Sequence, residues 1–189
     1  MPSKNKWNLT SIGKVLVCCF VLLLISFHSF AEKGNSPPEA PGEVRDFVQS
    51  FYDWYVPKSL AKSPTPAWVL AIRQKRSLFS PQLLSALSRD FSAQAKPSGS
   101  IVGLDFDPFL NGQDTGDRYE VGRVAESGDN YRVEVHGVWS GKKSENPDVI
   151  VELSRHRGHW MFTNFRYPEN RDLLATLQLL AEARRKHPR

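Results

Sequence analysis

The chain has 189 residues, of which 40% are hydrophobic and 24% charged, a balance typical of a folded globular protein and not of a disordered or fibrous chain. Its formal net charge is +5, from 25 basic and 20 acidic residues. Three of the lysines lie in residues 1–31, which contain no acid, so 22 basic and 20 acidic residues remain and the net charge falls to +2. We therefore expect no nucleic-acid partner.

Residues 1–31 have the pattern of a secretory signal peptide. Lysines precede an apolar run at 15–30, VLVCCFVLLLISFHSF, and small residues at Ser29 and Ala31 form the cleavage pattern. We predict cleavage near Ala31, a periplasmic or secreted protein, and contact with the inner membrane only during export. A retained N-terminal anchor stays open, although a spanning helix needs about 20 apolar residues. Both cysteines, Cys18 and Cys19, would leave with the signal.

The first half of the remaining chain is predicted to be helical. Residues 32–42, EKGNSPPEAPG, are predicted to form a flexible linker, and residues 43–189 a single domain. Apolar residues at helical spacing predict a first helix over 43–56, which Pro57 is expected to end. A short helix is predicted at 67–75 and another at about 81–95, begun by Ser80 as N-cap and broken by residues 97–100.

The second half is predicted to form a sheet and a last helix. Alternating patterns predict strands at 118–124, 131–139, 149–154 and 160–165, and the short polar turns between them indicate antiparallel neighbours. A leucine stripe predicts a final helix over about 170–186. The fold class is therefore α+β, with N-terminal helices packed on a curved, cone-like, four-stranded antiparallel sheet and a C-terminal helix added.

The stretch 101–122, IVGLDFDPFLNGQDTGDRYEVG, separates the two halves and is the first candidate for a site. Large apolar residues are interspersed among its polar ones, so we expect a structured loop that is fixed to the core. Its acids could bind a ligand or a partner, or could only bond the backbone N–H groups of turns. The candidate ligand- or partner-binding residues are Asp105, Asp107, Asn111, Gln113, Asp114 and Tyr119.

Three segments resemble a family of bacterial exported proteins known as domain of unknown function 3828: LDFDPFLNGQD at 104–114, RYEVG at 118–122 and FTNFRYP at 162–168. The family is grouped with the nuclear-transport-factor-2-like superfamily, so the resemblance implies a cone-shaped sheet wrapped around a long helix and a cavity. Superfamily enzymes use Asp, Tyr and His inside the cone, whereas some related exported proteins act as inhibitors or immunity factors against toxic enzymes. The helix after the last strand is an addition to the cone that could cover the sheet or extend a dimer contact.

Specific chemistries find little support in the sequence. A calcium loop of the EF-hand type starting at Asp105 would have Leu110 at its required glycine and Gly116 at its bidentate glutamate. Phosphate-binding glycine motifs are absent, so we predict neither a metal nor a cofactor. For acid–base chemistry, Asp105, Asp107, Tyr119, His136 and Asn164 are the candidates, although His136 is expected to face solvent.

We therefore interpret the chain as a non-enzymatic binding module that uses the 105–114 loop and the neighbouring sheet. Its partner is an unidentified protein or small ligand, and a homodimer stays open. The alternative is a cavity enzyme of the isomerase or dehydratase type with an aspartate base.

Overall fold

The computed structural model describes residues 40–94 and 103–186, which belong to one compact unit. The predicted signal peptide, most of the predicted linker and the predicted helix break at 97–100 lie outside these residues. Five helical elements are described: α2 (Ala40–Ser59), α3 (Ala67–Gln74), the short 3-10 helix η1 (Arg76–Leu78), α4 (Pro81–Gln94) and α5 (Leu173–Lys186). No helix in 40–94 or 103–186 is both long and apolar enough to cross a membrane.

The strands form an antiparallel sheet in the order β1-β2-β4-β5. Their bounds are β1 (Arg118–Ser127), β2 (Asn130–Trp139), β4 (Val149–His156) and β5 (His159–Arg166), and the two-residue β3 (Lys142–Lys143) pairs with β2. Inward-facing residues stand in register, with Val133 of β2 opposite Val151 of β4, which lies opposite Phe165 of β5. The predicted α+β fold, with its antiparallel sheet and C-terminal helix, is confirmed.

Helix α2 is longer than predicted at both ends. It begins at Ala40, so residues 40–42 of the predicted linker are helical, and it continues through Pro57 to Ser59. Pro57 lies in the last turn, where a proline removes only one backbone hydrogen bond. The carbonyl that loses this bond belongs to Asp53, which is exposed and can be hydrated.

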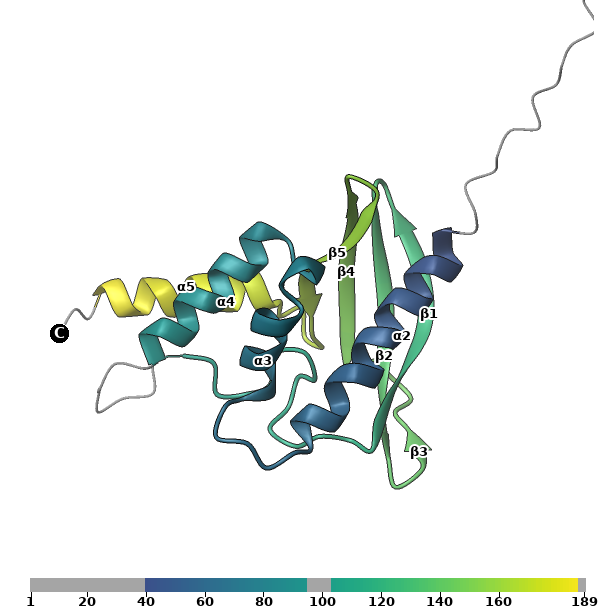
Figure 1. Ribbon diagram of the computed structural model, residues 1–189, viewed down its shortest axis with the longest axis horizontal. Coiled ribbons are helices and arrows are strands. Elements are labelled where there is room, and N and C mark those ends of the chain that lie inside the picture. Colours follow the sequence, from purple (N-terminus) through teal and green to yellow (C-terminus); the bar gives the residue numbers. More distant parts are fainter. Residues whose placement is uncertain (1–39, 95–102, 187–189) are drawn as a thin grey trace, which may run out of the picture. The chain divides into compact units, whose positions relative to one another are not determined.

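Helix α2 crosses one face of the sheet (Figure 1), and aromatic side chains fill the space between them. The ring of Phe51 stacks on Tyr55 with centroids 5.3 Å apart and meets Phe162 of β5 at 4.8 Å. Phe109, from the loop before β1, lies 5.5 Å from Phe51 and 4.8 Å from Phe165. All five of these side chains are at most 2% exposed. The resemblance implies a ligand cavity in this region, and these rings occupy that space.

Two side chains of α2 bind the backbone of β1 along its outer edge. The Gln49 amide donates to the carbonyl of Tyr119 at 3.0 Å and accepts from the N–H of Val121 at 2.9 Å. The Arg45 guanidinium donates to the carbonyls of Val121 and Gly122 at 3.0 and 2.7 Å. These bonds hold α2 against the sheet and satisfy strand groups that face away from β2.

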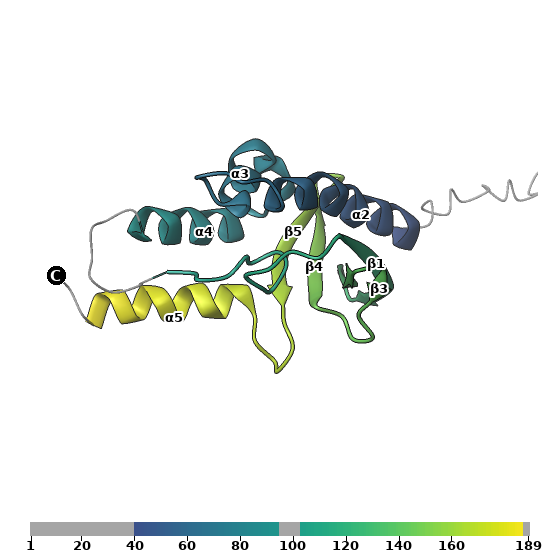
Figure 2. The same ribbon diagram turned by 90° about the horizontal axis from the view of Figure 1, so that it is seen from below.

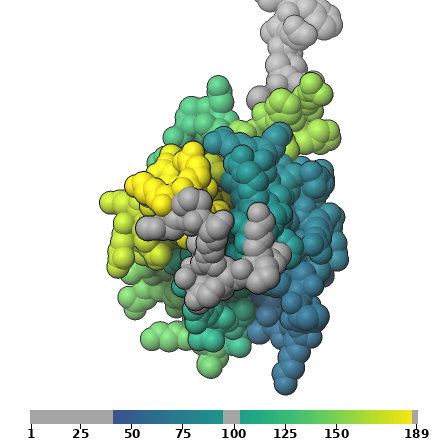
Figure 3. Space-filling model, turned by 90° about the vertical axis from the view of Figure 1, so that its left-hand side faces the viewer, coloured from purple at the N-terminus to yellow at the C-terminus, as the bar shows by residue number. Residues whose placement is uncertain are grey.

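Helices α4 and α5 run side by side beyond β5 (Figures 1 and 2), and Figure 3 looks onto this end. A buried ion pair joins them, with Nη1 of Arg184 2.7 Å from Oδ1 of Asp90, a residue that is only 1% exposed. Oδ2 of Asp90 also accepts from the Leu104 N–H at 3.1 Å and from Gln94 at 2.8 Å. One carboxylate therefore connects α4, α5 and the loop that leads to β1.

Candidate functional site

The 103–117 loop is a structured turn, as its apolar residues predict. The Asp107 N–H donates to the Gly112 carbonyl at 2.8 Å, and the Asn111 N–H donates to the Asp107 carbonyl at 2.9 Å. Asn111 closes this turn with a φ of 58°, a left-handed conformation that asparagine tolerates better than most residues. Phe109 and Leu110, which lie inside the turn, are buried in the core and fix the loop there.

Three buried tyrosines of the core donate hydrogen bonds to the loop. The Tyr55 hydroxyl donates a short hydrogen bond to Oδ2 of Asp107, and Oδ1 of Asp107 accepts from the Phe109 N–H at 2.9 Å. The Tyr52 hydroxyl donates to the Phe109 carbonyl at 2.9 Å, and Tyr167 donates to the carbonyl of residue 108 at 2.8 Å. Burial raises the pKa of each of these tyrosines well above its usual value, so all three remain donors at neutral pH.

Asp107 has an unusual pKa because of this environment. Burial raises the pKa of its carboxyl to about 6, although the Tyr55 hydroxyl and the backbone amides of Phe109 and Leu110 pull it down. A raised pKa of this kind is often found in catalytic acids and bases. Here, however, each carboxylate oxygen already accepts a hydrogen bond that holds the loop, so the geometry indicates a structural role.

The raised pKa of Asp107 predicts a specific pH dependence of stability. The folded protein binds this proton more tightly than the unfolded chain, whose carboxyl titrates near 3.8. The stabilising contribution is therefore complete below about pH 4 and is lost as the pH rises through about 6, a change of about 3 kcal/mol. We expect the unfolding free energy of the wild type, minus that of Asp107→Asn, to fall by most of this amount, about 2–3 kcal/mol, between pH 4 and pH 7 in urea titrations. A difference that is constant across this range would contradict the prediction.

The other sequence candidates do not converge on one point. Asp105 and Asp114 are exposed, and neither carboxylate has a hydrogen bond or ion pair to the described residues. Gln113 donates to the backbone carbonyl of Asp105 at 3.1 Å. Asn111 donates to the carbonyl of Asp148 at 3.3 Å, so its side chain is used in joining loops. Within 40–94 and 103–186, no group of His, Cys, Asp or Glu side chains is arranged to hold a metal ion.

Two candidates from the sheet are buried. Tyr119 is 3% exposed, and its ring stacks on Tyr52 with centroids 5.7 Å apart. His136 does lie on the sheet face away from α2, but the expectation that it faces solvent is wrong, since the residue is only 8% exposed. Its Nδ1 lies 3.0 Å from the Ser144 carbonyl, and Gly122 lies against the other side of the ring. The missing side chain of Gly122 makes room for this imidazole.

Three loops meet at one end of the sheet, and we name them together the rim: residues 103–117, 140–148 and 167–172. The Asp117 carboxylate accepts from the Ser140 N–H at 2.6 Å, which joins the first two loops. Asn111 binds both the Asp148 carbonyl and, at 3.4 Å, the guanidinium of Arg171, so it connects all three. The rim is therefore a hydrogen-bonded surface and not a set of independent loops.

Trp139, the last residue of β2, lies directly before the 140–148 loop of the rim and is 42% exposed, one of few large apolar side chains in the described residues with this much exposure. Gly116 packs on its indole, and a Cβ at that position would lie 3.3 Å from the ring. A groove of about 490 Å³ runs beside Trp139 and is lined also by residues 142–148 and Pro168. Trp139 was not identified as a site residue from the sequence. Its position directly before the polar connection SGKKSENP was the available signal.

No family model matches the chain, and no curated protein matches it. Among solved structures, the chain is similar to one in the type VI effector–immunity complex Tae3–Tai3 from Ralstonia pickettii, with 23% identity over 66% of this chain and 94% of that one, at a TM-score of 0.47. It is also similar to a protein of unknown function from Bacteroides thetaiotaomicron, with 16% identity over 66% and 89% of the two chains, at a TM-score of 0.46. Likenesses this distant carry no conclusion about function.

Proposed function

We propose that this protein is a non-enzymatic binding module whose partner is another protein, bound at the rim around Trp139. The exposed indole carries the proposal. Tryptophan is among the residues that contribute most binding energy at protein interfaces, especially beside a groove that a partner can fill. Trp139 has both features, because the residue is 42% exposed and borders the groove that residues 142–148 and Pro168 also line.

The rigidity of the rim supports the same proposal. A surface that is already ordered loses little conformational entropy when a partner binds, which favours affinity. The three loops are held in place by hydrogen bonds of the side chains of Asp107, Asn111 and Asp117. The candidate loop thus contributes to binding mainly by shaping the rim.

The geometry does not favour the alternative of a cavity enzyme with an aspartate base. Such a base must come within hydrogen-bonding reach of the substrate proton. Asp107 is the candidate with a raised pKa, but Tyr55 and the Phe109 N–H occupy its two oxygens. The space beneath it holds the packed rings of Phe51, Phe109 and their neighbours.

We also propose that the protein acts outside the cytoplasm, after cleavage near Ala31, and that it belongs among the exported proteins of domain of unknown function 3828. The signal pattern of residues 1–31 supports the first point, and the segments at 104–114, 118–122 and 162–168 support the second. The partner would then be a protein of the same compartment or a second copy of this chain.

Site-specific photo-cross-linking tests the rim in the cells that make the protein. We expect a photoreactive amino acid at position 139 to give one discrete adduct upon irradiation, with a mass that separates a second copy from another protein. The matched controls are positions 60 and 179, because Leu60 and Leu179 are also large, apolar and exposed, at 54% and 66%. Equal adducts at all three positions, or none at 139, would contradict the proposal.

A further inference from the structure

Charge is unevenly distributed over the described residues. Residues 58–94 contain six basic side chains and a single acid, Asp90, which is 1% exposed and paired with Arg184. The loop at 103–117 has the opposite character, with four acids and no basic residue. The outer surface of α3, η1 and α4 therefore shows positive charge that no exposed carboxylate of the same segment balances.

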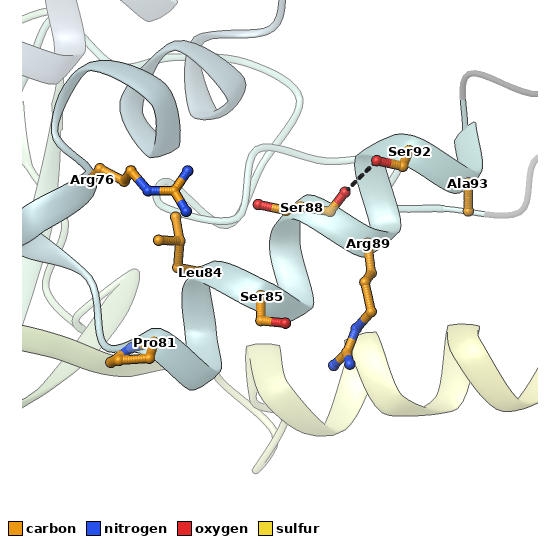
Figure 4. A pocket seen from close by; sticks show the side chains of 8 residues that line it. All are labelled: Arg76, Pro81, Leu84, Ser85, Ser88, Arg89, Ser92 and Ala93. Carbon is orange, nitrogen blue, oxygen red and sulfur yellow. Dashed lines mark hydrogen bonds between the residues drawn. The ribbon is translucent and has the colours of Figure 1, made fainter.

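A groove of about 540 Å³ follows α4 on this basic surface (Figure 4). Arg76 of η1 borders it near Leu84, whereas Arg89 lies nearer the other end of α4 and extends toward α5, where it also borders a second groove. Small residues of α4 leave the space open: Ser85, Ser88, Ser92 and Ala93. The Ser92 hydroxyl donates to the Ser88 carbonyl at 2.9 Å, so Ser85 and Ser88 are the serines that offer hydroxyl groups to a ligand. The groove spans residues 81–93 of a helix, about 18 Å, which is the length of an extended segment of about six residues.

The two guanidinium groups of the groove have no carboxylate partner among the described residues. Neither Arg76 nor Arg89 takes part in an ion pair, and both are exposed. The arginines of the sheet differ, since Arg132 and Arg166 both pair with Glu152, at 3.1 and 2.6 Å. Arginine and serine together are well suited to bind carboxylates, because the guanidinium offers a fixed fork of donors and the hydroxyl adds another.

We propose that this groove is a second interaction surface, separate from the rim, which binds an extended acidic segment of a partner protein. Carboxylates spaced along that segment would pair with Arg76 and Arg89, and the serine hydroxyls would bond the groups between them. An acidic protein segment fits better than an anionic membrane, because membrane-surface helices insert bulky apolar side chains. The large apolar side chains that are exposed in 40–94 and 103–186 are Leu60, Trp139 and Leu179, and none belongs to α3, η1 or α4.

Fluorescence anisotropy of a labelled hexaglutamate peptide, titrated with the full chain, tests this proposal. We expect binding that weakens as salt rises from 50 to 300 mM, and a loss of about tenfold or more in Arg76→Glu/Arg89→Glu. The matched control is Lys62→Glu/Arg157→Asp, which changes the net charge equally at exposed positions that line neither this groove nor the rim and should retain binding. Because all four residues lie on the surface, urea titrations of both variants should match the wild type.

Three results would overturn the proposal: no binding of the peptide at low salt, equal losses in the two charge-reversed variants, or capture by phosphatidylglycerol vesicles without capture of the peptide. A hexaglutamine peptide should not bind under any condition. The outcome is separable from that of the cross-linking experiment, because Trp139→Ala leaves this groove intact and should bind hexaglutamate as the wild type does.

Discussion

Asp90→Ala is expected to lower the free energy of unfolding by about 3–5 kcal/mol, the usual cost of removing one partner from a buried ion pair. The substitution takes the buried carboxylate away from the Arg184 guanidinium, whose side chain is only 19% exposed. It also removes the acceptor of the Leu104 N–H, which lies in a buried residue. Urea unfolding followed by circular dichroism would measure the change.

A double-mutant cycle separates the ion pair from the other bonds of Asp90. In an Arg184→Met background, Asp90→Ala should cost clearly less, because the guanidinium charge is already gone. Asp114→Ala is the matched control, since that carboxylate is exposed and should contribute within about 0.5 kcal/mol. An equal cost of Asp90→Ala in both backgrounds would show that the ion pair contributes nothing.

Asp107→Ala is expected to lower the unfolding free energy by about 2–4 kcal/mol at pH 5, because two buried donors lose their acceptor. These donors are the Tyr55 hydroxyl, in a side chain with no exposed surface, and the N–H of Phe109. Asp107→Asn should cost much less, since an amide oxygen still accepts from Phe109 and the amide nitrogen can donate to the tyrosine hydroxyl.

Asp105→Ala is the control for this substitution, because Asp105 lies two residues away in the same loop and is exposed. We expect a change within about 0.5 kcal/mol. Thermal unfolding of the three variants and the wild type would rank them. If Asp105→Ala and Asp107→Ala cost the same, the loop would not depend on the Tyr55–Asp107 bond.

The fold was readable from the sequence where periodicity is strong. Alternation in β2, as in Tyr131, Val133 and Val135, predicts a strand with one buried face, and all three residues are buried. Element ends were less predictable, because Pro57 was expected to end the first helix and instead lies in its last turn, which continues to Ser59. The two-residue β3 has no sequence pattern of its own, since it exists only by pairing with the end of β2.

The structured loop that carries the site candidates was predictable from the sequence, but its side-chain contacts were not. The mixture of acids and aromatic residues at 104–114 indicates a structured loop, but it does not show which carboxylate turns inward. That choice depends on Tyr55, which is 52 positions away along the chain and meets Asp107 only in the folded protein. Asp90 and Arg184 were missed for the same reason, since each stands in an amphipathic helix of ordinary pattern and their pairing spans 94 positions.

The hydrogen bonds from α2 to β1 limit how this sheet can grow. An edge strand with unpaired backbone groups can take up another strand, whether from a binding peptide or from a second copy that would extend the sheet into a fibre. Between Tyr119 and Gly122, the Gln49 amide and the Arg45 guanidinium already use those groups. An incoming strand would have to displace both side chains, so this segment of β1 is protected against edge-to-edge growth of the sheet. A partner that binds there must recognise side chains instead of the backbone.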